Sequence, residues 1–81
     1  MERIRLGMLR GLGFTRRQLE VIEYMAAGYS NNEIEETMGI KYAGLKKHRE
    51  KIIKMGNKLF PINDFKTAAD IVNYLQKQGI I

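Results

Sequence analysis

The sequence predicts an all-α fold, in which residues 14–81 form a compact domain of four helices. Capping patterns with Ser or Thr followed three residues later by Gln, Glu or Asp recur along the chain, each ahead of apolar residues at helical spacing. Glycines follow these segments where helices usually end. No segment shows the alternation of apolar and polar residues typical of a half-buried strand.

Length and composition restrict the class of protein. A chain of 81 residues can build one hydrophobic core. It has no cysteine and one histidine, so we expect no disulfide, no metal site and no cofactor. No apolar run has the length that a bilayer requires, which favours a cytoplasmic protein without a membrane partner. No nucleophile with a matching base and no phosphate-binding glycine loop is found, so we expect neither an enzyme nor a small-molecule site.

The first helix is expected to start after residue 14. Residues 1–13 contain three glycines and are predicted to be a linker or short arm. Thr15 is a good N-cap, and Gln18 stands at the position that completes a capping box. Gly28 supplies the C-terminal stop.

The second and third helices follow each other closely. Ser30 and Glu33 form the next capping pattern, and Gly39 stops a helix of roughly two turns. Helical periodicity resumes two residues later and predicts a long third helix over about residues 42–59. Its inward stripe comprises Leu45, His48, Ile52, Met55 and Leu59.

The end of the third helix and the start of the fourth are less regular. Gly56 and Asn57 are expected to weaken the third helix, and Pro61 requires it to stop. The fourth helix ends near Gln78 and begins after either Asp64 or Thr67, since both residues can cap a helix.

Charge is divided sharply along the chain, whose formal net charge is +5. Every charged residue between 18 and 36 is a glutamate. Between residues 41 and 58 every charged residue except Glu50 is basic. Two helices joined by a tight glycine turn, the second of them basic, are typical of a helix-turn-helix. In this motif the second helix enters the major groove of DNA. The sequence therefore predicts duplex DNA as the partner.

The segment "FTRRQLEVIEYMAAGYSNNEIEETMGI" and the following "LKKH" resemble the LuxR/GerE-type DNA-binding domain of bacterial transcription regulators. The tail "TAADIVNYLQKQGII" is similar to the fourth helix of that family. The chain departs from the family pattern at Glu35, Lys41 and Gly44, and its link between the third and fourth helices is longer.

The resemblance implies a sequence-specific transcription regulator that binds as a homodimer through its fourth helix. The resemblance and the helical wheel together assign base contacts to Ala43, Lys46, Lys47 and Glu50. Phosphate contacts are expected from Arg16, Arg17, Ser30, Asn31, Asn32, Lys51 and Lys54. The expected dimer interface comprises Val72, Tyr74, Leu75 and Gln78.

Two alternatives stay open at this point. Region four of a sigma factor has a similar helix-turn-helix pattern, and such a protein would bind RNA polymerase and recognise one promoter element as a monomer. A protein-interaction module would keep the fold and sequester another regulator without binding DNA. Glu35, Gly44 and Glu50 make the second alternative credible, because each departs from what a DNA-binding helix pair favours.

Overall fold

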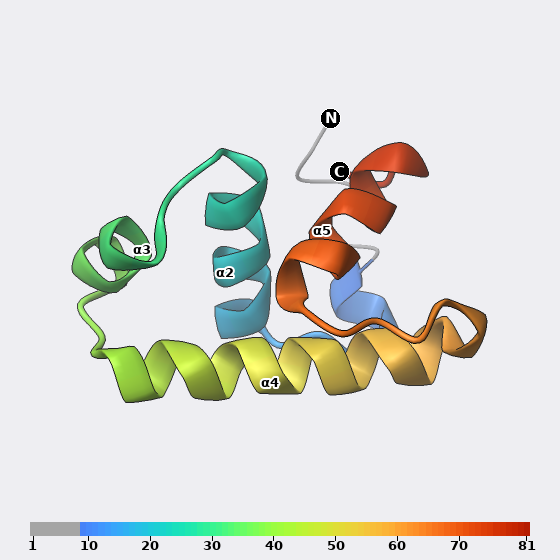
Figure 1. Cartoon of the computed structure of the whole chain (residues 1–81), viewed down its shortest axis with the longest axis horizontal. Coiled ribbons are helices and arrows are strands. Elements are labelled where there is room, and N and C mark those ends of the chain that lie inside the picture. Colours follow the sequence, from blue (N-terminus) through green and yellow to red (C-terminus); the bar gives the residue numbers. More distant parts are fainter. Residues whose placement is uncertain (1–8) are drawn as a thin grey trace.

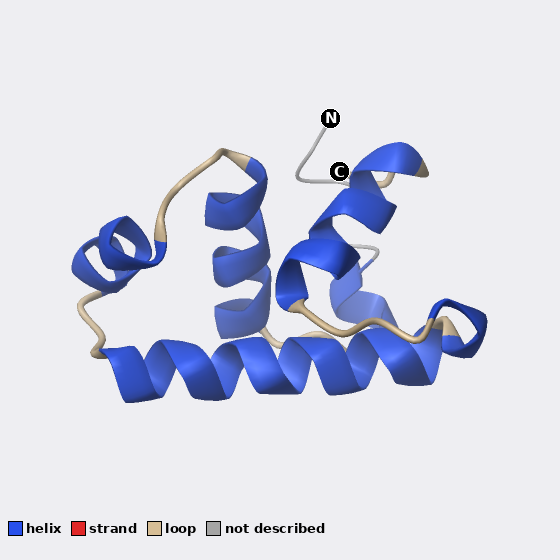
Figure 2. Ribbon diagram, viewed as in Figure 1, coloured by secondary structure: helices blue, strands red, loops and turns tan. Residues whose placement is uncertain are grey.

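The computed structural model of the protein describes residues 9–81, and all regular structure within this range is helical. The α-helices are α2 (Arg16–Ala26), α3 (Asn31–Met38), α4 (Tyr42–Leu59) and α5 (Ala68–Lys77), and a short 3-10 turn, η1 (Pro61–Asn63), lies between the last two. Residues 9–12 are also helical. The predicted all-α class is confirmed (Figure 2).

The long helix α4 forms one side of the molecule, and the other helices pack against its upper side (Figure 1). The N-terminal end of α2 lies against the middle of α4, α3 lies near the first turn of α4, and α5 packs against both α2 and α4. The opposite side of α4 carries no other element of the described chain (Figure 1). This arrangement leaves one long helical surface uncovered.

Capping boxes start α2, α3 and α5. Thr15 Oγ1 accepts from the Gln18 amide at 3.2 Å, and the Thr15 amide donates to Gln18 Oε1 at 3.0 Å. Ser30 and Glu33 repeat this pair of bonds, and so do Thr67 and Asp70. Thr67 is therefore the N-cap of α5, which decides between the two starts that the sequence left open.

The turn between α3 and α4 depends on Gly39. This residue ends α3 in the left-handed conformation with φ +66°, which glycine adopts without steric penalty. The amide of Ile40 then donates to the carbonyl of Glu35 at 3.0 Å. The chain reverses within residues 39–41 and starts α4 beside α3. The third helix that the sequence predicted over residues 42–59 is confirmed.

The hydrophobic core lies between α2, α4 and α5. Ile22, Ile34, Ile52 and Ile71 are fully buried in it, together with Leu9. The sequence placed Leu9 in an arm ahead of the domain, but the turn at Gly13, with φ +127°, directs the helical residues 9–12 onto the core. The core therefore begins before residue 14.

The long connection between α4 and α5 is fixed to both helices. Asn57 Oδ1 accepts from the Phe65 amide at 2.6 Å, and Asn57 Nδ2 donates to the Phe65 carbonyl at 3.0 Å. The ring of Tyr74 lies 5.1 Å from that of Phe60 and 5.5 Å from that of Phe65, measured between centroids. Polar and aromatic contacts thus hold the connection against the domain.

The predicted dimer surface on the fourth helix needs correction. Val72 is 4% exposed and Leu75 is fully buried, because α5 turns these side chains toward α2 and α4 within the same chain. Tyr74 is half-buried among the aromatic rings of the connection, and only Gln78 is fully at the surface. Val72 and Leu75 are therefore core residues, with no surface to offer a second copy.

Candidate nucleic-acid interface

The outward side of α4 is built by a stripe of residues four, three and four positions apart. Ala43, Lys47, Glu50 and Lys54 make up this stripe, and all are exposed. Leu45 and Ile52 anchor the opposite side of the helix in the core. Because the inward residues fix the rotation of α4, the outward stripe points directly away from the domain.

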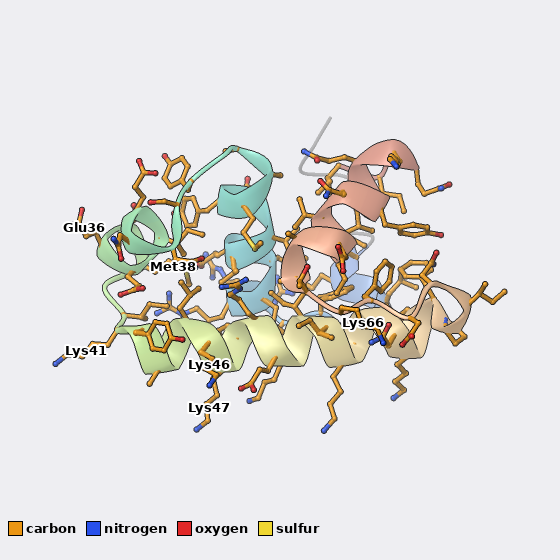
Figure 3. All side chains as sticks on the ribbon, in the orientation of Figure 1. Glu36, Met38, Lys41, Lys46, Lys47 and Lys66 are labelled. Carbon is orange, nitrogen blue, oxygen red and sulfur yellow. The ribbon has the colours of Figure 1, made fainter. Side chains whose placement is uncertain are left out.

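The predicted base-contacting residues are all at the surface. Lys46 and Lys47 project from the uncovered side of α4 (Figure 3). Lys47 belongs to the outward stripe, whereas Lys46 lies about 100° around the helix from it, on the flank. Glu50 stands among these lysines, and no ion pair of its carboxylate is found within the described chain.

The predicted phosphate-contacting residues lie on three helices. Lys51 and Lys54 are exposed on α4 itself. The N-terminal end of α2 carries Arg16 and Arg17, and the guanidinium of Arg17 pairs with Glu20 at 3.2 Å. This ion pair is exposed, so it adds little stability and can exchange for another anion.

The start of α3 combines amide donors with a carboxylate. The hydroxyl oxygen of Ser30 is occupied by the Glu33 amide. Hydrogen bonds from Ser30, chiefly from its amide, hold the pKa of the exposed Glu33 carboxyl below its usual value. Asn31 and Asn32, both exposed in the first turn, are further neutral donors at this end of the helix.

The start of α4 lacks such a cap. Lys41 is the N-cap residue and makes no side-chain hydrogen bond to the helix. Tyr42, the next residue, is 66% exposed, so its ring does not pack on the turn between α3 and α4. The start of α4 thus lacks a side-chain cap, and its residues Lys41, Tyr42 and Ala43 are exposed.

A family model described as bacterial regulatory proteins, luxR family, matches residues 12–58. The chain belongs to this family. It is therefore a DNA-binding regulatory domain rather than a member of an enzyme family, and the predicted resemblance is confirmed. Searches of curated proteins and of solved structures gave no significant match.

The matched range of this luxR-family domain covers the helix-turn-helix and ends just before the connection to α5. The family match therefore accounts for α2, α3 and α4, and it says nothing of the connection or of α5. Within residues 9–81 no helix is long and apolar enough to cross a membrane, and no group of acidic and histidine side chains could hold a metal ion.

One feature of the surface was not predicted. A hollow of about 190 Å³ runs along the flank of α4, between the start of α3 and the start of α5. It brings Arg49 and Lys66 to the edge of the helix-turn-helix, and neither residue was in the predicted set. Lys66 lies in the connection beyond the end of α4, and no pattern in the sequence indicates that this connection returns it to the flank of the helix.

Proposed function

We propose that this luxR-family domain is a sequence-specific regulator of transcription that inserts α4 into the major groove of duplex DNA. The observation that carries the proposal is the exposed outward stripe, which contains Lys47 and Lys54 and is flanked by Lys46 and Lys51, on a helix whose other side is fixed in the core. An α-helix with its side chains is about 10–12 Å across, and the major groove is about 12 Å wide. No described element obstructs this side of α4 (Figure 1).

Each residue of the proposed base-contacting set matches the chemistry of one base edge. Lys46 or Lys47 would donate to the O6 and N7 acceptors of guanine. Glu50 would accept from the amino group of cytosine, and Ala43 would contact the methyl group of thymine. Ala43, Lys47 and Glu50 share the outward stripe and would read neighbouring base pairs, whereas Lys46 would have to reach a base edge from the flank.

The proposed phosphate contacts fix the position of α4 in the groove without reading sequence. Lys51 and Lys54 lie beyond the N-terminal residues of α4 that would enter the groove, and they would contact phosphates where the helix leaves it. Arg16 and Arg17 would do so from the start of α2. Ser30, Asn31 and Asn32 stand at the start of α3, where main-chain amide groups favour an anion. The Ser30 oxygen accepts the capping bond from the Glu33 amide, so its O–H, like the side-chain amides of the asparagines, can still donate to a phosphate.

We propose a homodimer that forms on DNA and associates weakly in free solution. Of the expected interface, Tyr74 and Gln78 retain exposed surface. The exposed residues of α5 are Ala69, Asp70, Asn73, Gln76 and Lys77, which would bury few apolar atoms between two copies. Two half-sites on one duplex would supply the missing affinity by raising the effective concentration.

The roles within α4 are tested by comparing Lys47→Ala with Lys54→Ala. We expect Lys47→Ala to weaken binding to the selected site more than binding to unrelated DNA, with a loss of about 1–3 kcal/mol. Lys54→Ala should weaken both equally and lower the slope of log affinity against log salt by about one. Anisotropy titrations at several salt concentrations, on a site selected from random duplexes, measure both effects. Equal effects of the two variants on every sequence would refute these assignments.

A monomeric, sigma-like function is the second candidate, and the burial of Val72 and Leu75 favours it. Such a domain would bind RNA polymerase and recognise a single element. The same selection separates the two, because a homodimer enriches a palindrome and a monomer enriches one unpaired element. Absence of any affinity for DNA at low salt would favour a protein-interaction module instead.

A further inference from the structure

A second stripe runs along α4 beside the outward one. Tyr42, Lys46, Arg49 and Ile53 are also spaced four, three and four residues apart, and they line the flank hollow. Each precedes a residue of the outward stripe by one position, so this second stripe is rotated by about 100° from the first. When the outward stripe faces the floor of the groove, the second stripe faces one of its walls.

The wall of a major groove is a sugar–phosphate backbone. A helix that nearly fills the groove brings its flanks close to the phosphates on either side. On this flank the hollow is bounded by Asn31 from α3, by the second stripe of α4, and by Lys66 ahead of α5. Lys46, Arg49 and Lys66 are cationic, and Glu50 is the one acid among the residues that line the hollow.

We propose that this hollow holds the phosphate backbone of one DNA strand, with Tyr42, Arg49 and Lys66 as contacts. The inference rests on the proposed function and extends the DNA surface beyond the helix-turn-helix to the connection between α4 and α5. The Tyr42 hydroxyl donates to a phosphate oxygen at one end of the hollow, and the Lys66 amine donates at the other. Arg49, half-buried between them, has less freedom to lose on binding.

Two features of the connection allow the Lys66 amine to contact a phosphate. Its backbone amide donates to Asp70 Oδ2 at 3.2 Å, and the bonds of Asn57 to Phe65 fix the preceding residue. Its amine pairs with Asp64 at 2.9 Å, but the side chains of Lys66 and Asp64 are 76% and 73% exposed. An exposed pair of this kind is weak, so a phosphate can replace Asp64 as the partner of the amine.

The test compares Lys66→Gln with Lys77→Gln, an equally simple change at an exposed lysine in the last turn of α5, away from the hollow. We expect Lys66→Gln to lower affinity for the selected site and for unrelated duplexes by the same few-fold factor. It should also reduce the salt slope by about one. Lys77→Gln should leave both quantities unchanged. Circular dichroism melting of both variants shows that the fold is kept.

Two further variants test the contacts by other changes. Tyr42→Phe removes only a hydroxyl and should weaken all duplexes alike. Asp64→Asn removes the competing carboxylate and should strengthen binding to every duplex. Asparagine is suitable here because it tolerates the left-handed backbone of residue 64, where φ is +48°.

The outcomes separate this inference from the proposed function. If Lys47→Ala loses specific binding while Lys66→Gln binds like the original protein with an unchanged salt slope, the hollow does not hold the backbone and the function stands. If Lys66→Gln weakens one sequence only, Lys66 reads bases, and the inference is also wrong. If the unmodified protein binds no duplex at low salt, both the function and the inference fall.

Discussion

The first turn of α4 has no side-chain cap and contains Gly44, beside which a methyl group would meet only Ile40 Cβ at 3.7 Å. In the last turns of the same helix, Gly56 lies directly under Ile71, and Asn57 is bonded twice to Phe65. Both ends contain a glycine. A side chain at Gly44 would fit, whereas the lack of a side chain at Gly56 lets α5 pack closely against α4. The helix is held firmly at the end that belongs to the core and lightly at the end that is proposed to read DNA.

The contrast follows from what each end contacts. The C-terminal half packs on α5 and the connection, so its position is determined by the core. The N-terminal half is attached through Leu45, the turn at Gly39 and the packing of α3. A first turn with few contacts can adjust its side chains to the groove. Binding must then order these side chains, which costs conformational entropy.

Gly56→Val gives the largest expected effect at the firmly held end. A Cβ at residue 56 would stand 2.6 Å from Ile71 Cδ1 and 3.3 Å from Phe65 Cδ2, inside the core. We expect overpacking to lower the free energy of unfolding by about 3 kcal/mol. Urea denaturation followed by circular dichroism measures the loss. Stability equal to that of the original protein would show that α4 and α5 do not approach this closely.

Asn57→Ala removes the polar attachment of the connection. The amide and carbonyl of Phe65 lose their partners, and we expect a loss of about 2 kcal/mol. Hydrogen exchange should show faster exchange at the Phe65 amide while the amides of α2 keep their protection. Unchanged protection at Phe65 would contradict this attachment.

Gly44→Ala and Lys41→Ser should strengthen the lightly held end. Alanine is a better helix former than glycine by about 1 kcal/mol, and serine supplies the missing N-cap for a similar gain. We expect each variant to unfold at a higher urea concentration. If the first turn frays in the free protein, affinity for the selected site will rise with stability, up to about fivefold. A stabilised variant with unchanged affinity would show that the first turn is already ordered.

The smallest expected effect is on the pH dependence of stability. It comes from the cap of α3, which the start of α4 lacks. Because the folded state holds the pKa of Glu33 below its ordinary value of 4.5, this carboxylate stabilises the fold fully above that value. The contribution is lost as the pH falls through the lower, folded-state pKa. Glu33→Gln keeps the capping bond, as Gln18 does in α2, but cannot titrate. We expect the stability advantage of the original protein to disappear in acid, as measured by melting from pH 3 to 6. A constant difference across this range would contradict the role of Glu33.

Local signals made most of the fold predictable. The caps at Thr15 and Ser30, the stop at Gly39 and the spacing that starts from Leu45 each depend on neighbouring residues, and each is confirmed. The same signals located the exposed lysines of α4, because the inward stripe determines the outward one.

Features that depend on distant contacts were not predictable. Gly56 and Asn57 were expected to weaken α4, since propensity takes no account of the connection that packs on them. Val72 and Leu75 on α5 were expected to form a dimer interface, but both are buried within their own chain. Lys66 reaches the flank of α4 only because the connection folds back.

The division of charge in space has a consequence for the rate of binding. Lys46 and Lys47 project from α4, whereas Glu36 lies on α3, away from these two lysines (Figure 3). Near DNA this separation produces a torque that turns the lysines of α4 toward the duplex before contact. Encounters should therefore begin in a productive orientation, which raises the association rate constant. Added salt screens the torque beyond about 10 Å at 0.1 M, so ionic strength should slow association more than it speeds dissociation.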